Sequence, residues 1–213
     1  MEFLSDLLSI VLHLDQHLDR LIPQYGTWVY GLLFLIVFCE TGLVVTPFLP
    51  GDSLLFAVGT IAARGSLDVW WAAGLLIAAA VTGDAVNYWV GRVLGMELLR
   101  PGRRRFIRQE HVDRTHEFYE RHGAKTIVLA RFVPIIRTFA PFVAGFGRMT
   151  YSRFTMYNVS GGVLWIILFV IGGYFFGNLP VVRDHFGLAI LAIILISFVP
   201  MVVAFVQERS RAR

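Results

Sequence analysis

Four charged side chains lie in segments of this sequence that are otherwise apolar enough for a membrane interior. Glu40 and Asp52 lie in the stretch FCETGLVVTPFLPGDSLLF (38–56), and Arg131 and Arg137 lie in a later apolar run. A guanidinium group binds phosphate or carboxylate through two parallel hydrogen bonds, and a carboxylate can pair with arginine or take up a proton. The set therefore predicts an anion and proton site. The two arginines would bind a phosphate or carboxylate group of a substrate, and the two acids would pair with them when the site is empty or carry protons.

Asp84 is a fifth ionisable residue of this kind, in the apolar segment TGDAVNYW. Each such group costs about 2.5–3.5 kcal/mol on membrane-insertion scales, so the presence of five needs a reason. Two interpretations of Asp84 stand side by side: a proton-coupling or ion-pairing group, or, together with Asn87, a structural bridge between helices. For the whole set, the alternative to a binding site is a group of ion pairs that only stabilises the fold.

Helix-breaking residues accompany the charges in both segments. Proline removes a backbone donor and interrupts the helical hydrogen bonds, and non-helical backbone at membrane depth must be buried in protein or line a cavity. We therefore expect two hairpins that enter and leave the membrane on the same side, about 26–63 and about 126–147. The acids of the first would face the arginines of the second. The residues expected at the hairpin turns are Pro47, Pro50, Gly51, Pro134, Pro141 and Gly145.

The composition is that of an integral membrane protein. Of 213 residues, 56% are hydrophobic and 16% are charged, whereas an average soluble domain carries roughly 25% charged residues. About 20 apolar residues suffice for one helical crossing. We predict an all-α membrane fold with about three full transmembrane helices, the two hairpins, and amphipathic helices on the membrane surface. The crossings are expected at about 69–95, 154–177 and 186–206, and the surface helices at 1–22 and 109–123.

Positive charge is concentrated in the loop 97–125, which carries eight Lys or Arg residues against five acids, and in the tail QERSRAR. By the positive-inside rule, both are expected to be cytoplasmic. Three apolar segments separate them, and three full crossings would place the tail outside, so the segment 126–147 is expected to re-enter. The net charge of +4 comes mostly from arginines at the ends of apolar runs. This pattern indicates membrane loops and no nucleic-acid partner.

The two halves of the chain follow the same order: a surface helix, a hairpin broken by proline, and a long span. We expect an inverted repeat of opposed hairpins within a single membrane domain 1–213, with its first copy at 1–96 and its second at 126–177. Three pairs of segments share letters between the halves. They are Pro47-Phe48-x-x-Gly51 with Pro141-Phe142-x-x-Gly145, Thr82-Gly83 with Ser160-Gly161, and Gly91-x-x-x-Gly95 with Gly173-x-x-x-Gly177.

The sequence shows no residue set suited to an enzyme that acts on lipid phosphates. Ser160 in NVSGG has no evident base that would make it a nucleophile, and His13 and His17 have no evident third metal ligand. Phosphatase residue combinations and the glycine patterns of nucleotide sites do not occur. We therefore predict no enzymatic activity, no catalytic residue, no metal site and no cofactor.

Two long motifs in this chain resemble those of the DedA family of bacterial inner-membrane proteins, part of the wider VTT (SNARE-associated) group. They are E-x-G followed by P-x-x-P-G-D in residues 40–52, and R-F-x-P-x-x-R-T-F-x-P-x-x-A-G in residues 131–145. The resemblance extends over almost the whole chain and implies a lipid transporter with two opposed re-entrant hairpins. It also implies that the family's important acids are Glu40 and Asp52 here, and its important arginines Arg131 and Arg137.

The physical and family interpretations lead to one expected function. The resemblance implies a flippase of undecaprenyl phosphate, linked to the proton motive force, in the bacterial cytoplasmic membrane. The arginines would hold the phosphate while Glu40, Asp52 and Asp84 pair with them or carry protons. The expected partners are a membrane lipid and protons, and the protein could form a homo-oligomer. Two alternatives remain open: a flippase or scramblase of phospholipids such as phosphatidylethanolamine, and a membrane assembly factor without transport.

Overall fold

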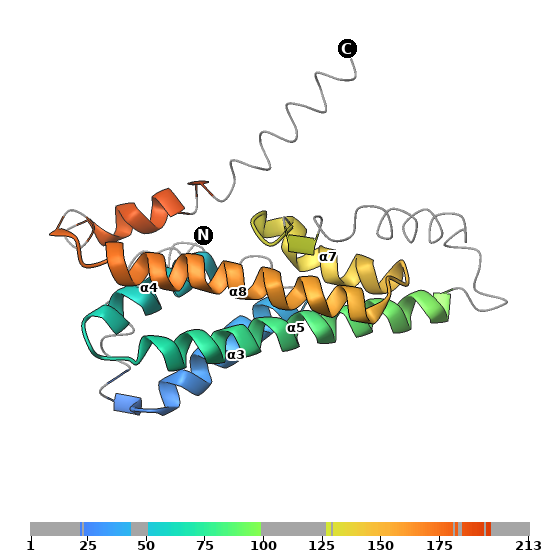
Figure 1. Ribbon diagram of the computed structural model, residues 1–213, viewed down its shortest axis with the longest axis horizontal. Coiled ribbons are helices and arrows are strands. Elements are labelled where there is room, and N and C mark those ends of the chain that lie inside the picture. Colours follow the sequence, from blue (N-terminus) through green and yellow to red (C-terminus); the bar gives the residue numbers. More distant parts are fainter. Residues whose placement is uncertain are drawn as a thin grey trace, which may run out of the picture. The chain divides into compact units, whose positions relative to one another are not determined.

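The described residues of the computed structural model form helices joined by turns, and no strand occurs among them (Figure 1). The structure describes residues 22, 24–43, 51–98, 127–128, 130–180, 182, 185–193 and 195–196. The main helices are α3 (Trp28–Gly42), α4 (Gly51–Ala63), α5 (Val69–Leu98), α7 (Pro134–Phe146) and α8 (Tyr151–Phe176). The predicted all-α class is confirmed.

The two longest helices match the sequence prediction closely. The helix α5 covers the expected 69–95 and α8 covers most of the expected 154–177. Within the described residues, these are the two helices that are long and apolar enough to cross a membrane. Part of the third expected crossing, at 186–206, is described, with helix at 186–193 and at 195–196. The expected surface helices at 1–22 and 109–123 lie outside the described residues, apart from residue 22.

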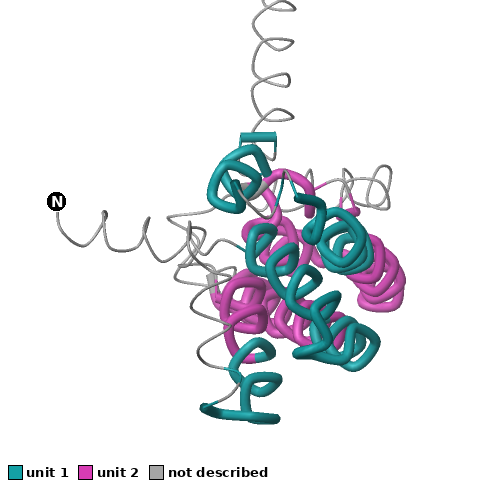
Figure 2. Tube along the Cα trace, turned by 90° about the vertical axis from the view of Figure 1, so that its left-hand side faces the viewer, with its two compact units in different colours: residues 1–34, 48–76, 165–213 teal, residues 35–47, 77–164 magenta. Residues whose placement is uncertain are grey.

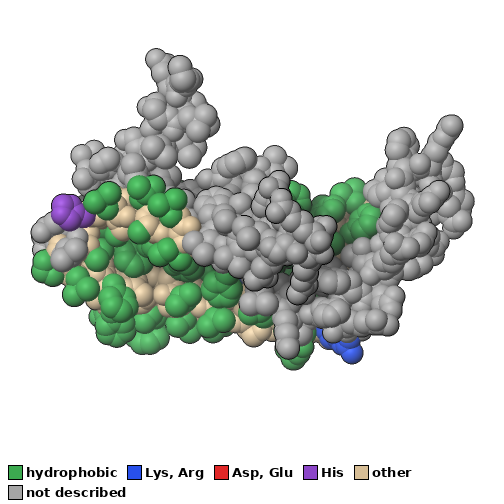
Figure 3. All heavy atoms as spheres, turned by 90° about the horizontal axis from the view of Figure 1, so that it is seen from above, with side chains coloured by type: hydrophobic (Ala, Val, Ile, Leu, Met, Phe, Trp, Pro, Cys, Tyr) green, Lys and Arg blue, Asp and Glu red, His purple; other side chains and the backbone are tan. Residues whose placement is uncertain are grey.

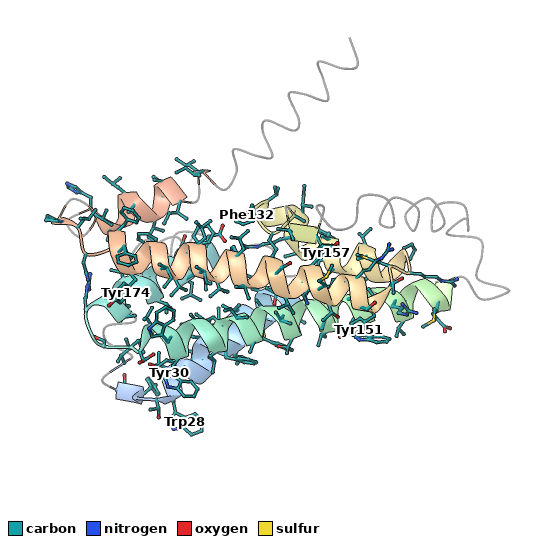
Figure 4. All side chains as sticks on the ribbon, in the orientation of Figure 1. Trp28, Tyr30, Phe132, Tyr151, Tyr157 and Tyr174 are labelled. Atoms are coloured by element: carbon teal, nitrogen blue, oxygen red, sulfur yellow. The ribbon has the colours of Figure 1, made fainter. Side chains whose placement is uncertain are left out.

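The exposed surface of these helices is apolar, as a lipid environment requires. Large side chains on α5 and α8 such as Val93, Leu168 and Phe175 are exposed. In the view of Figure 3, hydrophobic side chains cover much of the described surface, and basic side chains show at one place. Trp28, at the start of α3, points away from the helix (Figure 4). Exposed tryptophans at helix ends are typical of the membrane–water interface.

The first expected hairpin, 26–63, contains two separate helices. The helix α3 ends at Gly42 and α4 begins at Gly51. Pro47 and Pro50, expected at the turn, lie between them and outside the described residues. The apolar stretch is therefore not one continuous helix.

The second expected hairpin differs from the prediction. The helix α7 begins at Pro134, and Val133 before it is extended with φ −120° and ψ 107°, the conformation that a following proline favours. Pro134 therefore occupies the favoured first position of a helix. Pro141 and Gly145 lie inside α7, so their predicted place at a turn is wrong. Proline removes the single hydrogen bond to the carbonyl four residues earlier, and α7 continues through that loss.

The chain divides into two compact units, each made of segments that are far apart in the sequence (Figure 2). Unit 1 comprises residues 1–34, 48–76 and 165–213, and unit 2 comprises residues 35–47 and 77–164. The boundaries fall inside α3, α5 and α8, so each of these helices contributes to both units.

In unit 1, α4 packs against the second half of α8 through backbone contacts at glycine. A Cβ atom on Gly59 would overlap the carbonyl oxygen of Val170, and one on Gly173 would overlap the carbonyl oxygen of Phe56. A hydrogen bond from the Thr60 hydroxyl to the carbonyl of Gly173, at 3.4 Å, adds to this contact. Small residues allow such close approach of membrane helices.

In unit 2, α7 packs against α5 by the same pattern. A Cβ atom on Gly145 would overlap the carbonyl oxygen of Tyr88, and one on Gly91 would overlap the carbonyl oxygen of Phe142. Each position of α7 in this contact lies 86 residues after its counterpart in α4, and each position of α5 lies 82 residues before its counterpart in α8. The packing of a short helix on a long helix therefore repeats within the chain.

This register agrees with one of the three predicted letter matches. Gly91 and Gly95 correspond to Gly173 and Gly177, as expected. The other two matches are wrong, because the counterpart of Gly145 is Gly59, and Ser160-Gly161 is not in register with Thr82-Gly83. The correspondence between the two halves follows from which glycine contacts which backbone carbonyl group. Short runs of identical residues do not predict these contacts.

Candidate functional site

Glu40 and Arg137 form a buried ion pair in unit 2. Glu40 lies in the last turn of α3 and is 1% exposed, and Arg137 lies in the first turn of α7 and is 9% exposed. Nη2 of Arg137 donates to Oε1 of Glu40. Breaking one side of a buried pair costs about 3–5 kcal/mol, because it leaves an uncompensated charge. The structure thus joins the first predicted acid to one of the two predicted arginines.

Arg131 and Asp84 form a second buried ion pair in the same unit. Arg131 lies in the turn before α7 and Asp84 near the middle of α5, and each is 4% exposed. Nη2 of Arg131 donates to Oδ2 of Asp84 and to Oδ1 of Asn158 on α8. The partner of Arg131 is therefore Asp84, and this contact is compatible with both interpretations of Asp84, as an ion-pairing group and as a bridge between helices.

Asn87 links the segments that carry the first ion pair. It lies one turn after Asp84 on α5 and is fully buried. Its Nδ2 donates to the carbonyl oxygens of Thr41, at 3.1 Å, and Thr138, at 2.8 Å. These residues directly follow Glu40 and Arg137 in the sequence. One polar face of α5 therefore holds both arginine pairs, Arg131 through Asp84 and the Glu40–Arg137 pair through Asn87.

Asp52 lies in unit 1, in the first turn of α4, and is 8% exposed. Its Oδ1 accepts a hydrogen bond of 2.8 Å from the indole Nε1 of Trp165. A carboxylate in the first turn of a helix is also favoured by the helix dipole. The predicted pairing of Asp52 with an arginine stays a prediction. Gly51, expected at the hairpin turn, is the first residue of the same helix.

The comparisons with known proteins agree with this architecture. Residues 49–175 match the VTT domain. The chain is 51% identical to Protein DedA of Escherichia coli K12 over all of its length and 98% of that protein. The chain belongs to the DedA family. A membrane protein of Mycobacterium leprae is 41% identical, over 84% of this chain and 81% of that protein. No solved structure matches.

A third relative is named for its location. Inner membrane protein YqjA of Escherichia coli K12 is 34% identical over 75% of this chain and 72% of that protein. Together with the apolar helices α5 and α8, these names identify this chain as a DedA-family membrane protein. The names of the Mycobacterium leprae relative and of YqjA describe membrane proteins, and none of the three names describes an enzymatic activity.

Two site residues were not found by the sequence analysis. Asn158 binds Arg131, and Trp165 binds Asp52. Both lie in α8, in the run 154–182 that has no charged residue. That run offered a usable signal, because an amide or an indole N–H in an otherwise apolar span needs a hydrogen-bond partner.

The arrangement in unit 2 is suited to binding anions. Two guanidinium groups lie buried, and each pairs with a carboxylate. Nε of Arg131 has no hydrogen-bond partner within the described part of the chain, which leaves a donor for a ligand oxygen. Among the described residues, no three His, Cys, Asp or Glu side chains come together as a metal site would require. Buried guanidinium groups of this kind are groups that proteins use to bind phosphate and carboxylate.

Proposed function

We propose that this DedA-family protein moves a phosphate-bearing lipid across the bacterial cytoplasmic membrane, with undecaprenyl phosphate as the first candidate. The observation that carries the proposal is the pair of buried arginine–carboxylate contacts in unit 2, Arg137 with Glu40 and Arg131 with Asp84. Guanidinium groups bind phosphate in the geometry in which they bind carboxylate. A lipid phosphate can therefore take the place of a carboxylate, while the apolar tail stays in the membrane.

Proton coupling follows from this exchange. Protonation of Glu40 or Asp84 removes the negative charge that occupies its arginine, and the arginine then favours phosphate. By linkage, proton binding and phosphate binding change each other's affinity by the same factor. An inward proton gradient would thus drive movement of the head group, with Asp52 as a further proton carrier. No covalent step is needed.

The membrane topology is part of the proposal. The break between α3 and α4 and the turn before α7 are where two re-entrant hairpins would reverse. The repeated packing of α4 on α8 and of α7 on α5 supports two related halves, and opposed halves are a common plan for transporters. The basic loop 97–125 and the basic tail would lie in the cytoplasm.

Lipid movement in proteoliposomes tests the function directly. Undecaprenyl phosphate and phosphatidylethanolamine are followed separately, with and without a proton gradient. The proteins compared are the wild type, Arg131→Ala, Arg131→Lys, and the control Arg64→Ala at an exposed position of unit 1. We expect gradient-stimulated movement of the polyprenyl lipid, lost in Arg131→Ala, reduced in Arg131→Lys because the forked guanidinium is missing, and kept in Arg64→Ala.

Other results would replace the proposal. Equal movement of both lipids without a gradient would make the protein a scramblase. No movement of either lipid, together with full biological function of a charge-swapped Glu40→Arg and Arg137→Glu protein, would indicate an assembly role. In that case the ion pair would only hold α3 against α7 within unit 2.

A further inference from the structure

The segment Asn158–Gly162 of α8 (NVSGG) surrounds the side chain of Arg131. Oδ1 of Asn158 accepts a hydrogen bond from Nη2 of Arg131, and the backbone carbonyl of Asn158 lies 3.3 Å from the same nitrogen. A Cβ atom on Gly161 would lie 3.1 Å from Cδ and 3.2 Å from Nε of Arg131. One on Gly162 would lie 3.6 Å from Nη2. We call Asn158, Gly161 and Gly162 the Arg131 cradle.

The cradle residues lie on one face of α8, at the spacing i, i+3 and i+4. Ser160 does not belong to it, since its side chain is exposed and its hydroxyl bonds to the carbonyl of Tyr157 at 3.3 Å. The amide of Asn158 is oriented by a second contact, in which Nδ2 donates to the carbonyl oxygen of Val81 at 2.9 Å. This contact leaves Oδ1 as the acceptor for Arg131.

The two side chains that bind Arg131 differ in charge. Asp84 balances the guanidinium charge, whereas Asn158 binds the same nitrogen without adding charge. An anion can replace Asp84, because the total charge at the site then stays the same. If the second side chain were also an acid, two negative charges would already surround Arg131, and a phosphate would be repelled.

We propose that the Arg131 cradle is a neutral positioning device, which holds the guanidinium in place while the Asp84 carboxylate is exchanged for a lipid phosphate. Asn158 acts through Arg131 and touches no substrate. It spares the protein the cost of re-ordering the arginine at each exchange. The free Nε of Arg131, which Gly161 leaves uncrowded, then donates to a phosphate oxygen. This inference deepens the proposed function and rests on it for the identity of the anion.

Two substitutions at Asn158 distinguish its effect on the orientation of the Arg131 guanidinium group from the effect of a negative charge beside that group. Asn158→Ala removes the acceptor, so the guanidinium is no longer held when Asp84 leaves. Asn158→Asp keeps an acceptor and adds a negative charge, so the guanidinium stays held but repels an anion. Gly161→Ala brings a methyl group against Nε and keeps both partners of Nη2. Gly172→Ala is the matched control, because nothing lies within 4 Å of a Cβ atom at that position of the same helix.

The first measurement is nuclear magnetic resonance of the arginine side chains, with ¹⁵N-labelled arginine in nanodiscs and Arg131→Lys to assign the signals. Hindered rotation about the guanidinium bonds reports whether Arg131 is held. With Asp84→Asn as the background, we expect Arg131 to remain hindered, and Asn158→Ala to release it. Asn158→Asp should leave it hindered. Released signals in the Asp84→Asn background, or no change on adding Asn158→Ala, would overturn the cradle.

The second measurement is the KM and kcat of undecaprenyl phosphate transport in proteoliposomes. Asn158→Ala should raise KM by about tenfold to a hundredfold, the range for losing one hydrogen bond to a charged group. Asn158→Asp should raise it further, Gly161→Ala should raise it, and Gly172→Ala should leave it unchanged. An equal loss of kcat in both Asn158 variants at constant KM would refute the positioning role. If the wild type moves no lipid, the proposed function fails, and the resonance experiment still decides the cradle.

Discussion

Adjacent glycines of α8 offer a strict test of the close packing in unit 1. Nothing lies within 4 Å of a Cβ atom on Gly172, whereas a Cβ atom on Gly173 would meet three backbone atoms of Phe56. Two of these, the carbonyl carbon and Cα, lie at 2.9 and 3.0 Å, and an ordinary contact is 3.4–4 Å. The carbonyl carbon alone requires the backbone of α4 to move by at least about 0.5 Å, from 2.9 to 3.4 Å, and the carbonyl oxygen of Phe56, which lies closest of the three, requires more before Gly173→Ala is accommodated.

The two alanine variants should change stability in opposite directions. Gly172→Ala should stabilise the protein by about 0.4–1 kcal/mol, because alanine reduces the entropy of the unfolded chain at a compatible position. Gly173→Ala should destabilise it by about 1–3 kcal/mol, the usual cost of overpacking. The free energy of unfolding is measured by titration with sodium dodecyl sulfate in mixed micelles. Equal stabilities for the two variants would refute the close approach of α4 and α8.

Three further predictions concern the ion pairs and the buried polar contacts. Glu40→Ala and Arg137→Ala should each destabilise by about 3–5 kcal/mol, and the double variant by clearly less than their sum; an additive double-mutant cycle would contradict the pair. Asn87→Leu should cost about 1–3 kcal/mol, since two buried carbonyl contacts are lost, and should reduce transport; unfolding titration and the liposome assay measure both. Trp165→Phe should destabilise by about 1–3 kcal/mol in wild type but by less in an Asp52→Asn background, where the acceptor charge is gone.

The periodicity and length of apolar runs predicted the helices well. The long helix α5 and most of α8 were found because charge-free or nearly charge-free segments of more than 20 residues have few alternatives in a membrane. Pro134 was found at a turn for a local reason, since the residue before proline is restricted to extended backbone. Pro141 misled the prediction because one missing hydrogen bond does not end a helix that is packed closely through Gly145.

The partners within the site were harder to predict than the residues themselves. The sequence singled out Glu40, Asp84, Arg131 and Arg137 by their charge in apolar surroundings. It paired the arginines with the acids of the first hairpin, and the structure gives Arg131 to Asp84. Which acid pairs with Arg131 depends on where the turn before α7 lies against α5 and α8. Asn158 was missed for the same reason, because one amide in an apolar span has no partner that spacing alone can name.

The repeated packing also bears on why the buried charges exist. In the register that relates α5 to α8, the counterparts of Asp84 and Asn87 are Ile166 and Phe169. In the register that relates α4 to α7, the counterpart of Arg137 is Gly51. Unit 1 therefore achieves the same close contact of a short helix on a long helix with apolar residues at the positions of Asp84 and Asn87.

Buried ion pairs can often be replaced by packed apolar side chains without loss of stability, and in unit 1 the counterparts of Asp84 and Asn87 are the apolar Ile166 and Phe169. A close contact of a short helix on a long helix therefore forms in unit 1 without charges at these two positions. If the Asp84–Arg131 pair served the fold alone, packed apolar side chains would take over that role, and Asp84→Ile with Arg131→Met should leave both stability and lipid movement intact. We expect stability within about 1–2 kcal/mol of wild type and complete loss of movement. Movement retained by that double variant would show that the pair serves the fold alone.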